Sequence, residues 1–194
     1  MRELLYVDCC IRGPESRTAQ LAEAFLSGLG SGLHVSRLPL TEQALRPLTG
    51  EFFDARQRLL DEGALSHPRF ALAHQFAQAD EIMIAAPFWD LAFPALLKIY
   101  IENVCVVGIT FRSGAQGLEG LCRAKDLVFL TTRGGFYTGG ALEMGSRYLD
   151  ALHTFFGVGA YHCVAADGMD VAGFDSGSAL RGAMAQARAL AASL

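Results

Sequence analysis

The sequence lacks the features that mark several classes of protein. No apolar stretch approaches the roughly 18 residues of a membrane-spanning helix, so no such helix is expected. The 16 basic residues are scattered among 20 acidic ones, which gives a net charge of −4 and no basic patch for nucleic acid. The opening stretch, MRELLYVDCC, carries Glu3 and Asp8 where a secretory signal would be apolar, so we expect no signal peptide.

Cysteine is also sparse and unpatterned. The five cysteines form an odd set without a C-x-x-C motif, so neither a disulfide framework nor a metal site is expected, and the cytoplasm is the predicted compartment. The neighbours Cys9 and Cys10 are either a redox pair or two buried free thiols. The five histidines show no spacing typical of metal ligands.

The residues that are present alternate between two patterns. Short apolar runs typical of buried parallel strands are separated by stretches with helical apolar spacing. This alternation predicts one α/β domain over residues 1–194, with a parallel sheet and right-handed crossovers. Strands are expected at 3–8, 33–38, 81–86, 125–132 and 160–166, and helices at 18–30, 52–60, 69–78, 94–107, 142–156 and 176–194.

Open α/β sheets bind ligands beyond the carboxyl ends of their strands, so the loops there carry the candidate site. After the first strand, CCIRGPESRT places Ser16, Arg17 and Thr18 at a helix start. Free N–H groups and the helix dipole make such a start a good phosphate site. The other interpretation is an ordinary N-cap beside a surface arginine. The segment contains neither G-K-[ST] nor G-x-G-x-x-G.

Two further loops add complementary chemistry. PFWDL follows the third strand and is either an aromatic wall for a ligand or a cap on the core. RGGFY follows the fourth strand, where Gly134 and Gly135 either present backbone N–H groups to a flat ligand or form a plain turn. A phosphate site, an aromatic wall and a glycine pair on one sheet edge together fit a planar ring on a phosphorylated arm. FMN has that shape.

The chain resembles the FMN-dependent NADH azoreductases, or NADH:quinone oxidoreductases, of the flavodoxin-like superfamily, over nearly its whole length. AAPFWDLAFPALLK resembles the family pattern A-P-[MF]-[YW]-N-F-x-[IF]-P-x-x-L-K, and GITFR and TTRGG follow in the same order. The resemblance implies a three-layer α/β/α fold with a five-stranded parallel sheet of order 2-1-3-4-5. It also implies bound FMN, with NADH or NADPH as electron donor.

Residue roles follow from the same resemblance. The FMN phosphate is expected at Ser16, Arg17 and Thr18, with Cys10 where the family has a serine. The backbone of Gly134 and Gly135 is expected to stabilise the reduced ring, and no side chain acts as a nucleophile. The residues expected to bind the cofactor are Cys10, Ser16, Arg17, Thr18, Pro87, Phe88, Trp89, Asp90, Leu91, Thr132, Arg133, Gly134 and Gly135.

The expected activity is a two-electron, ping-pong reduction of quinones and also of azo compounds. The resemblance implies a homodimer with each active site at the subunit junction. The helix at 94–107, with Leu97, Tyr100, Ile101 and Val104, either forms that interface or packs only on its own sheet. Two other functions compete: a flavodoxin-type electron carrier, and a low-molecular-weight phosphatase-like hydrolase. The hydrolase needs C-x₅-R, whereas six residues separate Cys10 from Arg17.

Three positions depart from the family pattern. Asp90 replaces an asparagine, which removes an amide donor and adds a carboxylate near the expected ring. Cys10 is a weaker hydrogen-bonding partner than serine. Ser113 stands where many relatives have a tyrosine after T-F-R. These departures bear on affinity and substrate range more than on the fold.

Overall fold

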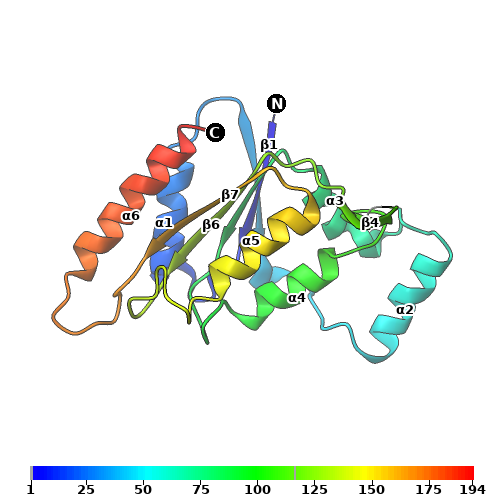
Figure 1. Cartoon of the computed structure of the whole chain (residues 1–194), viewed down its shortest axis with the longest axis horizontal. Helices are drawn as coiled ribbons and strands as arrows, with labels where there is room; N and C mark the ends of the chain where they lie inside the picture. Colours follow the sequence, from blue (N-terminus) through cyan, green and yellow to red (C-terminus); the bar gives the residue numbers. More distant parts are fainter. Residues whose placement is uncertain (1, 116) are drawn as a thin grey trace.

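A five-stranded parallel sheet forms the centre of the computed structural model, which describes residues 2–115 and 117–194 (Figure 1). The strands lie in the order β2-β1-β3-β6-β7, and every neighbouring pair is parallel. Numbered along the chain, this is the predicted order 2-1-3-4-5, so the flavodoxin-like topology is confirmed. The strands are β1 (Arg2–Asp8), β2 (Leu33–Pro39), β3 (Glu81–Ala85), β6 (Asp126–Thr132) and β7 (Ala160–Ala166).

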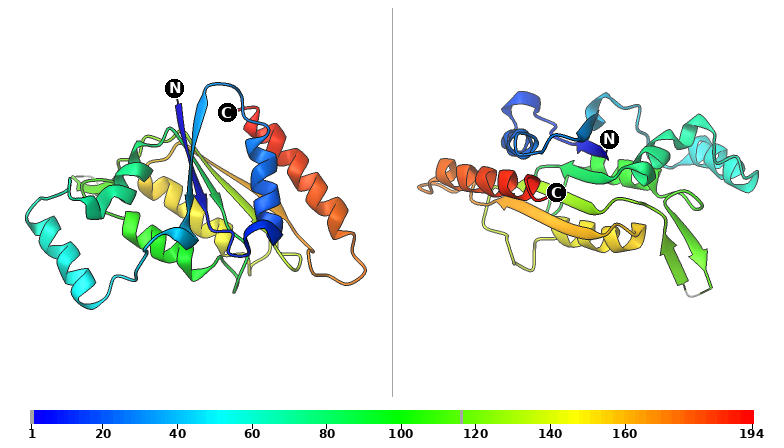
Figure 2. Two further views of the ribbon diagram at one scale, coloured as in Figure 1. Left: turned by 180° about the vertical axis from the view of Figure 1, so that it is seen from behind. Right: turned by 90° about the horizontal axis from the view of Figure 1, so that it is seen from above.

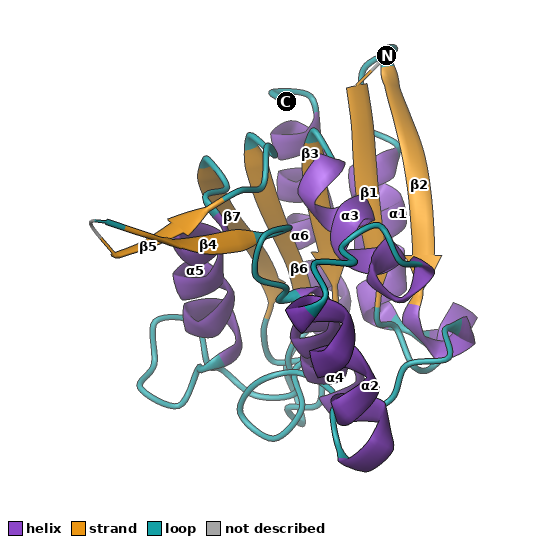
Figure 3. Cartoon of the chain, turned by 90° about the vertical axis from the view of Figure 1, so that its right-hand side faces the viewer, coloured by secondary structure: helices purple, strands orange, loops and turns teal. Residues whose placement is uncertain are grey.

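Helices cover both faces of this sheet, which gives three layers (Figure 2). Helices α1 (Arg17–Leu26) and α6 (Ser176–Ala191) cover one face. Helices α3 (Ala71–Gln78), α4 (Ala95–Val104) and α5 (Gly145–Phe156) cover the other face. Helix α2 (Gly50–Asp61) lies at one end of the molecule in Figure 1, the end that faces the viewer in Figure 3. None of its residues is buried.

The strand sequences explain why two cores form. In β1, Leu4 and Tyr6 point into the core beneath α1 and α6, whereas Leu5 and Val7 point into the core beneath α3, α4 and α5. Successive side chains alternate between the faces of a sheet, so a strand buried on both faces must be apolar throughout. Each fully buried leucine or phenylalanine contributes about 1.5–3 kcal/mol.

A two-stranded hairpin beside α5 is absent from the sequence prediction. It consists of β4 (Phe111–Gly114) and β5 (Gly117–Gly120), which pair antiparallel. Most of its residues are exposed, so no apolar alternation marks it in the sequence. Gly120 is required where the hairpin meets α5, because a Cβ atom there would lie 2.0 Å from the nitrogen of Gly157.

The apolar face of helix α4 is not the subunit interface expected from the sequence. Leu97, Tyr100, Ile101 and Val104 are all buried within the chain's own core, and the ring of Phe76 packs edge-on against Tyr100 at 6.4 Å. The helical spacing was predicted correctly, but its apolar face packs on the sheet that the helix follows. The proposed interface on this face is therefore wrong.

Helix ends differ from the predictions by a few residues. The helix expected at 18–30 ends at Leu26, and the helix expected at 94–107 ends at Val104. Both continue into turns whose residues keep some apolar character, and a boundary of this kind is the least defined part of an apolar pattern. Within residues 2–115 and 117–194, none of the helices has the length and apolar character needed to cross a membrane.

Candidate active site

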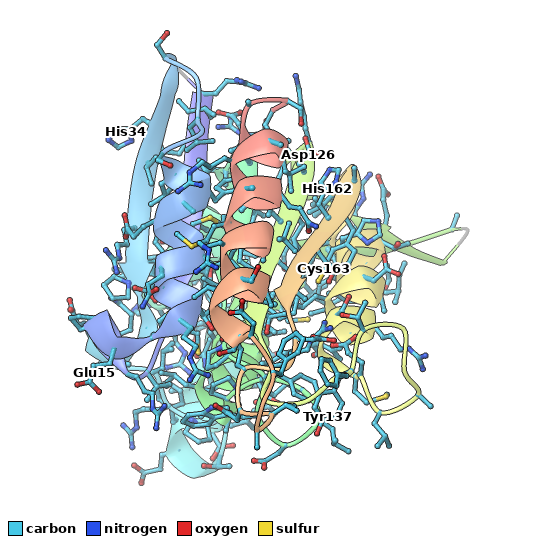
Figure 4. The ribbon with its side chains drawn as sticks, turned by 90° about the vertical axis from the view of Figure 1, so that its left-hand side faces the viewer. Glu15, His34, Asp126, Tyr137, His162 and Cys163 are labelled. Atoms are coloured by element: carbon cyan, nitrogen blue, oxygen red, sulfur yellow. The ribbon has the colours of Figure 1, made fainter. Side chains whose placement is uncertain are left out.

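A cavity of about 630 Å³ opens at the carboxyl ends of β1, β3 and β6. Figure 4 shows Glu15 and Tyr137, two residues of its wall, at one end of the sheet, and Asp126 and His162 toward the other. The cavity brings together twelve of the thirteen residues expected to bind the cofactor, all except Cys10. Its lining consists of Arg12, Glu15, Ser16, Arg17, Thr18, Pro87, Phe88, Trp89, Asp90, Leu91, Thr132, Arg133, Gly134, Gly135, Tyr137, Met169 and Asp170.

The start of α1 forms one end of the cavity. Ser16 is the N-cap of this helix, and its hydroxyl accepts a hydrogen bond from the N–H of Ala19 at 3.3 Å. Thr18 is fully buried, and its hydroxyl hydrogen-bonds the hydroxyl of Thr132 at 2.7 Å, which ties α1 to the end of β6. Among the described residues, the N–H groups of Arg17 and Thr18 have no acceptor, as expected in the first turn of a helix.

Cys10 lies behind this end of the cavity. Its side chain is buried, and its sulfur lies 3.8 Å from the carbonyl oxygen of Ala85. Burial, followed by the nearby charge of Asp8, raises the pKa of the Cys10 thiol. Burial likewise raises the pKa of Cys9 to about 12, so both thiols stay protonated at neutral pH. The two cysteines are free and buried, in agreement with one of the two sequence interpretations.

The loop after β3 supplies the aromatic wall. Phe88 is half-buried and its N–H donates to the carbonyl of Thr132, so the loop continues the β3–β6 pairing past the strand ends. Trp89 and Leu91 remain exposed. Asp90 and Leu91 have φ angles of 49° and 68°, the left-handed region that side chains other than glycine rarely adopt. Asp90 is exposed, with its backbone in this strained turn.

Gly134 and Gly135, called the glycine strip from this point on, form the third wall. A Cβ atom on Gly134 would lie 2.8 Å from a carboxylate oxygen of Asp170, and one on Gly135 would lie 2.9 Å from the ring of Tyr137. Within residues 2–115 and 117–194, the N–H groups of the strip have no hydrogen-bond acceptor. Glycine leaves room for the side chains of Asp170 and Tyr137 at these positions, and each glycine leaves a backbone donor available.

Arg133 lines the cavity with a side chain that is only 2% exposed. Its guanidinium lies 3.2 Å from the carboxylate of Glu143 and 3.3 Å from that of Asp167, and it donates to the hydroxyl of Thr138. It also lies 5.7 Å from the ring centre of Phe88. These contacts fix the loop between β6 and α5 against the end of β7, so the side chain acts mainly as a buried brace.

Asp167 completes this brace from the end of β7. Burial by itself would raise the pKa of its carboxyl group. Hydrogen bonds from Thr138 and Tyr137 and the charge of Arg133 outweigh that effect and lower it. The carboxylate accepts the N–H groups of Tyr137 and Thr138 at 2.9 and 2.7 Å. The ring of Tyr137 is thereby held 4.6 Å from the ring of Phe88.

Five lining residues were missed by the sequence reasoning: Arg12, Glu15, Tyr137, Met169 and Asp170. Met169 and Asp170 follow the fifth strand, and the carboxyl end of that strand reaches the same edge of the sheet. Their N–H groups donate to the carbonyls of Arg133 and Gly134, both at 2.9 Å. The position of the loop in ADGMD, directly after a strand, was the available signal.

Comparisons with known proteins agree with this fold. A family model described as flavodoxin-like fold matches residues 2–191. The FMN-dependent NADH:quinone oxidoreductase 2 of Clostridium acetobutylicum is 36% identical over 196 residues, which covers 97% of each chain. An FMN-dependent NADH:quinone oxidoreductase of Clostridium perfringens is 36% identical over 177 residues, 89% of each chain. The chain belongs to this family of oxidoreductases.

Solved structures support the same architecture. The azoreductase of Bacillus anthracis str. Sterne superposes with a TM-score of 0.88 over all of both chains, at 24% identity. An FMN-dependent NADH-azoreductase of Bacillus anthracis str. Ames Ancestor, solved in complex with FMN, gives a TM-score of 0.87 at 20% identity and covers 100% of this chain and 99% of that one. At these identities the likeness establishes the fold.

Proposed function

We propose that this protein binds FMN in the cavity and transfers two electrons from NADH or NADPH to quinones and to azo compounds. One observation carries the proposal. A single cavity joins a helix start with two free N–H groups, at Arg17 and Thr18, to a glycine strip with two more. The family assignment supports it, because the relatives are named as FMN-dependent NADH:quinone oxidoreductases.

The residues of the cavity fit FMN. Its volume of about 630 Å³ lies within the range of small-molecule sites. The start of α1 suits a phosphate group, because free N–H groups and the helix dipole both favour an anion. Phe88 and Trp89 offer apolar faces to a planar ring. The glycine strip leaves the space that a Cβ atom would fill, with donors toward the ring edge.

When bound, FMN supplies the hydride and electron chemistry. The chain supplies binding and electrostatics. Ser16, Arg17 and Thr18 hold the phosphate, and the N–H groups of the glycine strip stabilise negative charge on the ring edge. The ion pairs of Arg133 hold the glycine strip and Tyr137 in place beside Phe88. Donor and acceptor use the same cavity in turn, which is the ping-pong order, and its flat aromatic wall selects for planar molecules.

A homodimer is part of the proposal. Several large apolar side chains are exposed beside the cavity, which is unfavourable for a surface that stays in water. A second copy that covers them would also shield the cavity from solvent. These side chains are Trp89, Leu91, Phe136, Leu142 and Met144. The five free cysteines fit a reducing compartment, so the cytoplasm is the proposed location.

The hydrolase alternative fits the site poorly. A cysteine nucleophile works as a thiolate and needs a lowered pKa. Burial instead raises the pKa of Cys10, and its sulfur faces the core rather than the cavity. An electron carrier remains the other alternative, and activity with NADH separates it from the enzyme.

Absorbance spectroscopy tests the proposal. We expect the purified protein, supplied with FMN and washed, to keep a yellow chromophore that NADH or NADPH bleaches and a quinone restores. A yellow protein that neither NADH nor NADPH bleaches would favour the electron carrier. A protein that stays colourless after exposure to FMN would contradict the proposed function.

A further inference from the structure

Charged side chains of both signs surround the α1 end of the cavity. Arg12 and Arg17 are positive, and Glu15 and Asp170 are negative, so these four lining residues have no net charge. A phosphate bound there would gain from the helix start but would meet two carboxylates. The balance between these groups therefore decides how strongly this end of the cavity holds an anion.

Asp170 is held firmly in this position by its backbone. The N–H groups of Gly168, Met169 and Asp170 donate to the carbonyls of Gly135, Arg133 and Gly134, each at 2.9 Å. The loop after β7 thus runs alongside the glycine strip. One oxygen of the Asp170 carboxylate lies 2.8 Å from where a Cβ atom of Gly134 would be.

Arg17 reaches across to this loop from the first turn of α1. Its guanidinium donates to the other oxygen of Asp170 at 2.9 Å and to the carbonyl of Met169 at 2.8 Å. The side chains of Arg17 and Asp170 are 44% and 73% exposed, so water screens the pair. An exposed ion pair of this kind is weak and easily exchanged for another partner.

We propose that Asp170 competes with the cofactor phosphate for Arg17 and thereby sets the affinity for FMN and the preference for FMN over riboflavin. The inference rests on the proposed function. A phosphate at the start of α1 and the carboxylate of Asp170 draw on the same guanidinium and repel each other. Asp170 therefore makes FMN binding weaker than the phosphate site alone would allow.

The experiment measures dissociation constants by isothermal titration calorimetry, with FMN and riboflavin, on the wild-type protein stripped of flavin and on Asp170→Asn. Asparagine keeps the size of the side chain and removes its charge. We expect the variant to bind FMN about threefold to fivefold more tightly at low salt, the upper part of the range for an exposed charge pair. Riboflavin has no phosphate, so its affinity is expected to stay within about twofold of the wild-type value.

Two controls separate direct competition from a general field effect. Glu15→Gln removes a carboxylate from the same end of the cavity that lies outside the Arg17 pair, and we expect it to tighten FMN binding less than Asp170→Asn does. In an Arg17→Gln background, Asp170→Asn is expected to lose most of its effect, as a double-mutant cycle requires.

Unchanged or weaker FMN binding by Asp170→Asn would overturn the inference. So would equal tightening by Glu15→Gln, or equal tightening of riboflavin. Each of these results leaves FMN bound to the wild-type protein and so leaves the proposed function intact. A wild-type protein that binds neither flavin would overturn the function and the inference together.

Discussion

Glu81 is a carboxylate buried at the end of the sheet opposite the cavity. It is the first residue of β3, and its side chain is only 2% exposed. One of its oxygens lies 3.2 Å from the guanidinium of Arg2, and the other, buried, has no hydrogen-bond partner among the described residues. Asp126 begins the neighbouring strand β6 and pairs with His162 at 2.7 Å (Figure 4).

This environment favours the protonated form of Glu81. Burial raises the pKa of its carboxyl group, the negative charge of Asp126 raises it further, and the positive charge of Arg2 opposes both. A carboxyl group whose pKa is higher in the folded than in the unfolded chain binds protons more tightly when folded. Its contribution to stability is therefore fully present below the unfolded pKa and is lost as pH rises through the folded pKa.

Glu81→Gln should accordingly stabilise the protein at alkaline pH. Glutamine keeps the shape of the side chain but carries no charge to bury, so we expect the free energy of unfolding at pH 8 to rise by about 1 kcal/mol. The gain should shrink as pH falls through the raised pKa. Urea denaturation at a series of pH values measures both effects.

Glu119→Gln is the matched control for this prediction. Glu119 is exposed on the hairpin, and a side-chain hydrogen bond from Arg112 lowers the pKa of its carboxyl group. Removing its charge should not stabilise the protein at pH 8. If the gain at Glu119 equals that at Glu81, or if the gain at Glu81 does not depend on pH, burial of the Glu81 charge is not what limits stability.

The turn between β3 and α4 stores backbone strain. Asp90 and Leu91 are, among the described residues, the two non-glycine positions with positive φ angles. For a leucine the left-handed region costs roughly 1–2 kcal/mol. The carbonyl of Leu91 accepts the N–H of Met144, which ties this turn to the loop after β6. Strain of this kind is typical of functional loops that the surrounding fold holds in place.

A pair of substitutions at Leu91 measures the strain. Leu91→Ala and Leu91→Gly both remove most of the exposed side chain, but only glycine adopts a φ angle of 68° without steric cost. We therefore expect the glycine variant to be more stable than the alanine variant by about 1 kcal/mol in urea denaturation.

At the neighbouring Ala92 we expect a substitution by glycine to destabilise the protein. Its φ angle is negative, so Ala92→Gly should lower the free energy of unfolding by about 0.5–1 kcal/mol, because glycine loses more conformational freedom on folding. If Leu91→Gly has a lower free energy of unfolding than Leu91→Ala, the turn is not strained in solution.

The strands of the main sheet could be predicted because each is buried on both faces. Leu127 and Phe129 face one core while Val128 and Leu130 face the other, so the sequence reads as a continuous apolar run. The hairpin carries no comparable signal. It is short and mostly exposed, and the contact of Gly120 with Gly157 depends on tertiary packing.

The same distinction applies to the candidate site. Three loops were predicted because each contains unusual residues directly after a strand. The loop that holds Asp170 also follows a strand, which marks it as a candidate, but the place of Asp170 beside the glycine strip depends on the hydrogen bonds between that loop and the strip. The inward direction of Arg133 was also missed, since its partners Glu143 and Asp167 are distant in sequence. The prediction that these loops bind FMN remains to be tested.

At the scale of the whole molecule, large apolar side chains are exposed in the loops after β3 and β6. Phe136, Leu142 and Met144 lie in the loop after β6 and are 63%, 59% and 48% exposed. Trp89 and Leu91 are exposed in the loop after β3, and the carbonyl of Leu91 accepts a hydrogen bond from the N–H of Met144. Exposed apolar side chains gathered near a binding site commonly mark an interface, and a homodimer would cover them symmetrically.

Analytical ultracentrifugation of a charged variant tests this proposal. The wild-type protein should sediment as a dimer at micromolar concentration, and Leu142→Asp together with Met144→Asp should shift it toward monomer by at least about tenfold in dissociation constant. Each substitution would bury a charge in an apolar contact, which is costly without a partner. Val35→Asp, at a residue that is 36% exposed on the edge strand β2, should leave the dimer intact. A monomeric wild-type protein would refute the dimer. If the double variant leaves the dimer unchanged, the interface lies elsewhere on the molecule. In that case only residues of the chain itself could exclude water from the cavity.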